Sequence, residues 1–212
     1  MAVSDLHWQP SLLLSGGPVR LDRRFGALER IDLDGRSWVD YAPGWVAGAD
    51  QLFAELVDTI QWGQRRRWMY GRELDEPRLT ARFSGPEPPW PSFLDEMRAA
   101  LSSHYRIEFD SVGLNLYRDG SDSVAWHGDH IAAEIAEPLV ALVSLGEPRT
   151  FRLRPSSAAE GGPPRSFALG RGDLLVTGGR CQREWQHSVP KVAKAGPRIS
   201  LAFRHGGYEA AS

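Results

Sequence analysis

A change of pattern at residue 107 is the feature that most constrains the fold of this chain. From Ile107 onward, short apolar stretches are separated by Gly, Pro and Asp, which are typical turn residues. Strands this short, at such close spacing, indicate a β-sandwich or a β-barrel. We therefore expect a mainly β fold with flanking helices. The predicted strands are Ser111–Tyr117, Leu139–Leu145, Thr150–Leu153, Ser166–Leu169, Asp173–Val176, Glu184–Ser188 and Ile199–Phe203.

Two segments upstream of these strands have the spacing of amphipathic helices. The first is Asp50–Trp62, with Asp50 as the expected N-cap and Gly63 as the expected stop. The second is Ser92–Ser103, with Ser92 as the expected cap. Each helix has one apolar face, which should pack on a sheet rather than carry chemistry. The apolar residues are Leu52, Phe53, Leu56, Val57 and Ile60 in the first helix, and Phe93, Leu94, Met97 and Leu101 in the second.

The length of 212 residues suits a single domain, residues 1–212, and the sequence contains no internal repeat or low-complexity tract. We expect residues 1–91 to form an N-terminal extension that contains the first helix. Residues 92–206 should then contain the second helix and the β core. Near the N-terminus, Leu12–Leu14 and Pro18–Leu21 flank Ser15-Gly-Gly17, which predicts two strands joined by a turn.

Composition excludes several classes of protein and favours a cytoplasmic one. The net charge of −2 provides no overall basic field, so any nucleic-acid surface must be local. The single cysteine, Cys181, excludes an internal disulfide and suits a reducing compartment. No signal peptide is recognisable, and no apolar run approaches the roughly 20 residues of a membrane span. We therefore expect a soluble cytoplasmic protein, a monomer with no membrane partner.

The strongest candidate for a functional site is the metal-ligand pattern His127-Gly-Asp129, with His187 far downstream. On an extended strand, residues two positions apart point to the same face, so His127 and Asp129 could take adjacent coordination positions. A second histidine, His187, would complete the two-histidine, one-carboxylate site of non-haem Fe(II) oxygenases. An isolated H-x-D is a weak signal. Its order relative to the other motifs is much more specific.

That order runs from Asn115-Leu-Tyr117 through His127-Gly-Asp129 and His187 to the segment Arg198–Arg204. It resembles the AlkB family of Fe(II)- and 2-oxoglutarate-dependent dioxygenases, which repair alkylated nucleic acids. The resemblance covers roughly Trp38 to Arg204. Tyr41–Trp45 looks like the entry motif of the family, and Pro77–Thr80 resembles its substrate-lid segment. The resemblance implies a double-stranded β-helix, a jelly-roll-like core, with His127, Asp129 and His187 as both the metal ligands and the catalytic centre.

The resemblance also implies which residues hold 2-oxoglutarate. Arg198 matches the family arginine that binds the distal carboxylate, and a guanidinium offers that carboxylate a planar, bidentate fork. Asn115 and Tyr117 match the family residues that hydrogen-bond the co-substrate, and they share one face of the predicted strand. Arg204 matches a second arginine near the metal. Ser200 stands where the bacterial pattern has Asn, which puts its exact contact in doubt.

The implied reaction removes alkyl groups from N-alkylated bases in DNA, or alternatively RNA, with O₂ consumed and aldehyde, succinate and CO₂ released. We predict that Trp68, Tyr70, Arg72 and Phe83 contact the substrate, and that Arg65, Arg66, Arg67 and Arg72 bind phosphates of single-stranded or duplex substrate. The stretch Arg65–Arg72 is read as a basic, aromatic loop. Ile131 stands where the bacterial pattern often has an acid that reads the base, which leaves base preference open.

Two other interpretations fit the sequence. A 2-oxoglutarate oxygenase acting on a protein, a lipid or a small molecule would have the same triad and the same Arg198. A non-catalytic jelly-roll binding module is the alternative from a different class. It would be favoured if His187 or Arg198 pointed away from His127 and Asp129.

Overall fold

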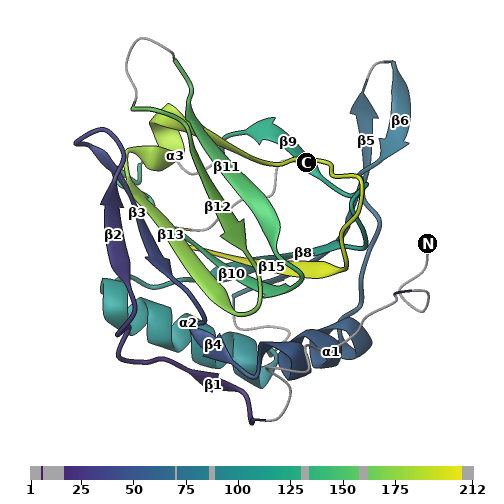
Figure 1. The fold of residues 1–212 in the computed structure, drawn as a ribbon, viewed down its shortest axis with the longest axis horizontal. Coiled ribbons are helices and arrows are strands. Elements are labelled where there is room, and N and C mark those ends of the chain that lie inside the picture. The colour runs from purple at the N-terminus through teal and green to yellow at the C-terminus, as the bar shows by residue number, and fades with distance from the viewer. Residues whose placement is uncertain are drawn as a thin grey trace.

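A computed structural model of the chain describes residue 6 and residues 17–69, 71–85, 89–129, 134–157 and 162–206. Two antiparallel sheets face each other (Figure 1). The larger one has the strand order β2-β3-β13-β10-β15-β8-β7, and the smaller one has the order β12-β11-β14-β9. The strands of the larger sheet are β2 (Glu29–Asp32), β3 (Ser37–Ala42), β7 (Leu79–Ser84), β8 (Ser111–Tyr117), β10 (Val140–Gly146), β13 (Asp173–Gly179) and β15 (Arg198–Arg204). Those of the smaller sheet are β9 (Val124–His127), β11 (Arg149–Pro155), β12 (Arg165–Leu169) and β14 (Trp185–Val189).

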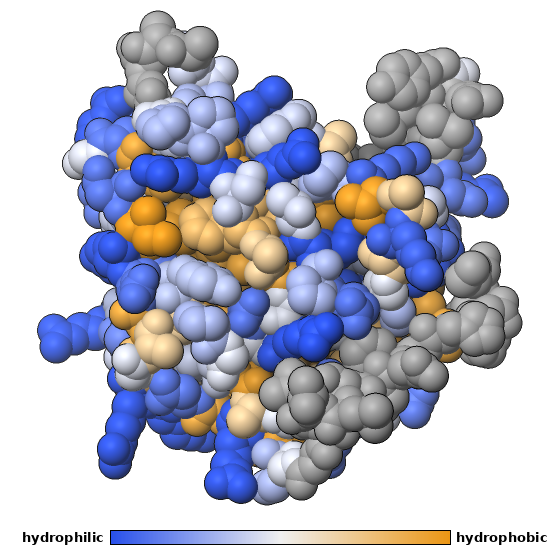
Figure 2. Space-filling view, viewed as in Figure 1, coloured by the Kyte–Doolittle hydropathy of each residue, from blue (hydrophilic) through white to orange (hydrophobic). Residues whose placement is uncertain are grey.

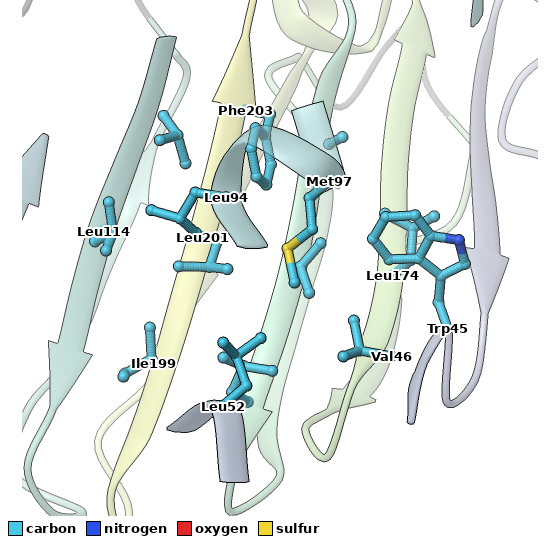
Figure 3. Close-up of a cluster of buried hydrophobic side chains, with 14 of the residues drawn as sticks. Trp45, Val46, Leu52, Leu94, Met97, Leu114, Leu174, Ile199, Leu201 and Phe203 are labelled. Carbon is cyan, nitrogen blue, oxygen red and sulfur yellow. The ribbon is translucent and has the colours of Figure 1, made fainter. Parts of the chain in front are cut away.

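Helices α1 (Ala49–Thr59) and α2 (Ser92–Tyr105) cover the outer face of the seven-stranded sheet (Figure 1). Alternation along β15 explains why they pack there: Ile199, Leu201 and Phe203 face the helices and are fully buried. Figure 3 shows these side chains meeting Leu52 of α1 and Leu94 and Met97 of α2. Full burial of one such side chain stabilises the fold by about 1.5–3 kcal/mol. The residues between them on β15 face the other way, into the space between the sheets.

A second apolar cluster fills part of that space. Val39 and Leu175 from the large sheet meet Phe151, Leu153 and Trp185 from the small one. The indole of Trp185 is satisfied because its Nε1 donates to Asp34 Oδ2 at 2.8 Å. Since both sheets place apolar side chains in this layer, the polar residues that share it stand out as candidates for function.

Both helices begin differently from the sequence prediction. Asp50 is not the N-cap of α1; that position belongs to Gly48, whose φ of 69° lies in the left-handed region that glycine tolerates. The helix ends at Thr59, before the expected Trp62. Ser92 is not the cap of α2 either, because it is already helical and Pro91 precedes it, with no side chain capping the helix. α2 also extends to Tyr105, two residues beyond the expected end.

The predicted strands all occur, mostly with longer or slightly shifted bounds, whereas several strands of the first ninety residues were missed. The stretch Arg65–Arg72 was read as a loop, but it belongs to a hairpin of β5 (Arg66–Met69) and β6 (Arg72–Asp75) that stands out from the body (Figure 1). β1 (Arg20–Leu21) pairs with β4 (Val46–Ala47). The expected partner segment Leu12–Leu14 lies outside the described residues.

Outside the two apolar clusters the molecule is polar. Figure 2 shows hydrophilic residues dominating the face in view, with hydrophobic residues gathered mainly in a band between them. Among the described residues, no helix has both the length and the apolar character needed to cross a bilayer.

Candidate active site

The three predicted metal ligands converge at the open edge of the small sheet. His127 is the last residue of β9, and His187 lies opposite it on β14, with the two ring centroids 4.2 Å apart. Asp129 follows two residues after the end of β9, so the H-x-D pair spans a strand end rather than a continuous strand. One ligand atom from each side chain lies within 4.8 Å of the others, as sharing a single metal ion requires.

The surroundings keep these side chains in the forms that bind a cation. Burial lowers the pKa of His187 to about 4, so its imidazole is neutral at pH 7. Burial alone would raise the pKa of Asp129, but the charge and hydrogen bond of Arg204, together with the two neighbouring histidines, outweigh it and hold that pKa well below its usual range. The Nδ1 atom of His127 lies 2.9 Å from the carbonyl oxygen of Ala125. An N–H at this position donates to that carbonyl and leaves Nε2 free for a metal.

Arg204 divides the two oxygens of Asp129 between two tasks. Its Nη2 donates to Oδ1 at 2.6 Å, whereas Oδ2 lies 4.0 Å from Nε2 of His187. The carboxylate is therefore oriented by Arg204 on one side and open toward the imidazoles on the other. Gly113 of β8 lies beside this guanidinium, and a Cβ there would make an ordinary van der Waals contact with Nη1 of Arg204, at 3.5 Å.

Arg198, at the other end of β15, is buried and has no carboxylate partner in the part of the chain that the structure describes. Only 1% of the residue is exposed, and its Nη2 donates to Ser144 Oγ at 2.7 Å. Its Nε and Nη1 meet no hydrogen-bond partner among the described residues. Burial lowers the pKa of this guanidinium, which nevertheless stays a cation because arginine titrates so high. Since a buried, unpaired charge is costly, the geometry fits an anion such as the far carboxylate of a dicarboxylic acid.

The other predicted co-substrate residues line the same face of the large sheet. Tyr117 pairs with Arg198 across the strands, with its ring centroid 5.2 Å from the guanidinium carbon. Asn115 pairs with Ser200 in the same way, one step along. All four side chains thus lie on the inner face that also carries Arg204.

Sequence reasoning missed a residue that contacts Asn115. Arg78 donates from Nε to Asn115 Oδ1 at 2.7 Å, and its Nη2 lies 3.0 Å from the carboxylate of Glu76, which is buried. The carbonyl of Pro77, between them, accepts from Ser123 N at 2.9 Å. The motif Pro77–Thr80 was the available signal, but a motif does not tell which strand its arginine reaches. Arg78 therefore ties the β5–β6 hairpin to the predicted co-substrate residues.

The predicted substrate contacts receive less support. Phe83 is on the wrong face: it pairs with Val112, packs against the helix-side core and lies near Trp90, so we withdraw it as a substrate contact. Its β-strand neighbour Arg82 has the inward parity instead. Arg66 pairs with Asp75 at 3.1 Å, which reduces its value as a phosphate contact. Tyr70 and Ile131, and the side chains of Arg67, Trp68 and Arg72, lie outside what the structure describes.

The remaining candidates for ligands have structural explanations. Burial raises the pKa of Cys181 to about 12, so this thiol, near Asp129 and His187, stays protonated. His205 accepts from the backbone N–H of Leu139 at 3.0 Å. His104 stacks on Phe25 with ring centroids 3.8 Å apart. None of the three joins the triad.

With the fold and the site in place, comparison with known proteins gives the class first. Residues 60–204 match the model of the 2OG-Fe(II) oxygenase superfamily. The solved structure of OsALKBH1 superposes with a TM-score of 0.58 at 15% identity, covering 84% of this chain and all of that one. This likeness shows the fold alone, and it agrees with the predicted double-stranded β-helix.

Curated relatives then narrow the class. The mouse alpha-ketoglutarate-dependent dioxygenase alkB homolog 3 is 30% identical over 92% of this chain and 76% of its own length. The Arabidopsis thaliana DNA oxidative demethylase ALKBH2 is 34% identical over 72% of this chain and 60% of its own. The chain therefore belongs to the AlkB family of the 2OG-Fe(II) oxygenases, as its motif order predicted.

Proposed function

We propose that this chain is an Fe(II)- and 2-oxoglutarate-dependent dioxygenase that removes alkyl groups from N-alkylated bases in DNA. One observation carries the proposal. A triad of two histidines and a carboxylate shares the space between the two sheets with Arg198, a buried cation that has no carboxylate partner among the described residues. A metal site alone would fit many activities. A metal site beside a buried arginine that lacks a carboxylate partner fits enzymes that use a dicarboxylic co-substrate, 2-oxoglutarate. The alkB homologues, named as dioxygenases and DNA demethylases, support the same reaction.

Each side chain has a defined task in this reaction. His127, Asp129 and His187 hold Fe(II), which supplies the oxidising chemistry as 2-oxoglutarate and O₂ are converted to succinate and CO₂. Arg204 fixes the carboxylate of Asp129 so that one oxygen points toward the imidazoles. Arg198 binds the distal carboxylate of 2-oxoglutarate, with Asn115 and Tyr117 beside it. Hydroxylation of the alkyl carbon releases the alkyl group as an aldehyde.

The substrates we propose are 1-methyladenine and 3-methylcytosine, in single strands before duplexes. Alkylation at these ring nitrogens makes the base cationic, and an aromatic face attracts a cation by about 0.5–2 kcal/mol. Trp68, on the hairpin, and Tyr70 remain the proposed aromatic contacts. A duplex would first have to give up base pairing to present the base. RNA is proposed as a second substrate, and a cytoplasmic monomer as the working form.

The test is a demethylation assay with Fe(II), 2-oxoglutarate and O₂ on methylated DNA, RNA and peptides, each with its unmethylated control. We expect methyl loss and formaldehyde from the single-stranded nucleic acids, and neither product with the Asp129→Ala variant. Methyl loss from peptides alone would move the assignment to the protein-modifying alternative. Succinate formation without any repair would preserve the dioxygenase and reject the repair function.

A further inference from the structure

The outer face of the four-stranded sheet is basic in a chain whose net charge is negative. Strands β9, β11, β12 and β14 contain four arginines and no Asp or Glu. One of them, Arg149, is buried. Arg152 and Arg154 are exposed on the outer face, whereas Arg165, also exposed, pairs with Leu153 and has the inward parity. The helices α1 and α2 pack against the other sheet, so neither covers this face (Figure 1).

These arginines differ from several exposed arginines elsewhere in the molecule. Arg30, Arg66 and Arg98 each pair with a carboxylate, at 2.7, 3.1 and 2.7 Å. Within the part of the chain that the structure describes, Arg152 and Arg154 have no such carboxylate. A patch of uncompensated guanidinium groups is complementary to a polyanion.

Arg154 is also held in a fixed position. Its guanidinium carbon lies 4.2 Å from the centroid of the Trp126 ring, and its Nε and Nη2 both donate to Gln186 Oε1, at 3.1 and 2.8 Å. These contacts leave Nη1 without a partner among the described residues. A cation that is already ordered loses less entropy when it binds, so this arginine is prepared for a phosphate oxygen.

The position of this patch relates it to the candidate active site. Trp126 precedes His127, and Gln186 precedes His187, so the patch lies on the back of the strands that carry two metal ligands. Arg154 pairs with Gln186 and Arg152 with Ser188 on adjacent strands, so the two arginines follow one another along β11. A single-stranded nucleic acid that places a base at the triad could continue over the β9 edge onto the outer face of the small sheet.

We propose that Arg152 and Arg154 bind phosphates of nucleotides that flank the reacting base, with Trp126 and Gln186 as positioning residues for Arg154. This inference rests on the proposed function, because it takes nucleic acid as the substrate. It adds a second contact surface, separate from the β5–β6 hairpin. The surface recognises the backbone and not the base, so its contribution is independent of sequence.

The experiment measures binding of an unmodified, fluorescent single strand of about 15 nucleotides, at the upper end of known site sizes, as salt is raised. Arg154→Gln and Arg152→Gln should each raise Kd about tenfold, the scale of one hydrogen bond to a charged group. Each should also reduce the slope of log Kd against log salt by about 0.7, the value for one phosphate in a single strand. Trp126→Leu should give a smaller loss of affinity, because it frees Arg154 without removing its charge.

Arg98→Gln is the matched control. Arg98 also stacks on a tryptophan, Trp90, at 5.2 Å, but it pairs with Asp95 and lies on α2. The Arg98→Gln variant should bind the single-stranded oligonucleotide as tightly as the unaltered protein does. The proposal is overturned if Arg154→Gln and Arg152→Gln also retain the original Kd and salt slope. It is equally overturned if polyglutamate of equal charge displaces the strand as well as an unlabelled oligonucleotide does.

A second measurement separates this proposal from the proposed function. A methylated trinucleotide carries only two internucleotide phosphates, so the arginine variants should lose far less activity on it than on the longer strand. Equal losses on both lengths would overturn the flanking-phosphate role. If long strands bind through these arginines but no substrate is demethylated, the phosphate contacts of Arg152 and Arg154 would be supported and the proposed demethylase function rejected.

Discussion

The two ends of β15 present the same side chain to two different electrostatic environments. Arg204 meets the carboxylate of Asp129 at 2.6 Å. Arg198, on the same face and six residues away, is more deeply buried and meets the hydroxyl of Ser144 and the ring of Tyr117, which are both neutral groups. The first guanidinium completes a charge pair within the chain. The second is a buried cation whose partner must come from elsewhere. The difference teaches which arginine organises the metal site and which one binds a ligand.

The largest effect is expected from Asp129→Ala, which removes a metal ligand and the partner of Arg204 together. Turnover should fall by more than about 100-fold, beyond what loss of an outer-shell partner costs. The free energy of unfolding should drop by about 3–5 kcal/mol, because a buried guanidinium loses its counter-charge. Product formation and urea denaturation measure the two effects. Asp95→Ala, which breaks an exposed ion pair, is the control and should cost about 1 kcal/mol or less. Turnover that survives Asp129→Ala would contradict the triad.

Exchanging each arginine for methionine sharpens the contrast between the two ends. Arg198→Met should raise the 2-oxoglutarate concentration for half-maximal rate by about 100- to 1,000-fold, the equivalent of a broken buried charge pair. Without co-substrate, however, it should leave the unfolding free energy unchanged or higher, because it removes an unpaired charge. Arg204→Met should instead destabilise the protein. Denaturation curves with and without 2-oxoglutarate measure both effects, and equal destabilisation by the two variants would contradict the account.

Acidification should weaken the metal-free protein through His187. Its pKa in the folded state is about 4, below the ordinary value of about 6.5, so the unfolded chain binds this proton first as pH falls. Stability should therefore be lost between about pH 6.5 and pH 4, by about 3 kcal/mol in total. The lowered pKa of Asp129 adds a further loss at lower pH. Denaturation across this range should show a flatter profile for His187→Leu; an unchanged profile would assign the loss to other groups.

A smaller effect is expected at Arg78, which connects the hairpin to the co-substrate residues. Arg78→Met removes the hydrogen bond to Asn115 and should raise the KM for 2-oxoglutarate about tenfold, the scale of one hydrogen bond to a charged group. Arg78→Lys should recover only part of this loss, because lysine lacks the planar fork. Steady-state kinetics at saturating nucleic acid measure the change. If only the KM for nucleic acid changed, Arg78 would serve the substrate and not the co-substrate.

Local sequence pattern predicted the parts of the molecule that depend on local chemistry. β8 was predicted at its observed bounds, since Ser111–Tyr117 alternates between a helix-facing and an inner side. The convergence of His127, Asp129 and His187 followed from motif order. The facing of Phe83 and the contact between Arg78 and Asn115 could not be predicted. Both depend on the register of β7 against β8, which pairs residues 27 to 37 positions apart in the sequence. The contacts of Arg154 with Trp126 and Gln186 likewise appear only when β9, β11 and β14 are brought together.

The most direct test of the contrast between Arg198 and Arg204 is an anaerobic titration of the Fe(II)-loaded protein with 2-oxoglutarate. Chelation of Fe(II) by the keto-acid end gives a visible charge-transfer absorption, which reports co-substrate binding without turnover. We predict one equivalent of 2-oxoglutarate bound by the unaltered protein, and the same absorption in Arg198→Met only at about 100-fold or more higher concentration. Arg198→Met that titrates at the same concentration as the unaltered protein would contradict the assignment of its guanidinium to the distal carboxylate.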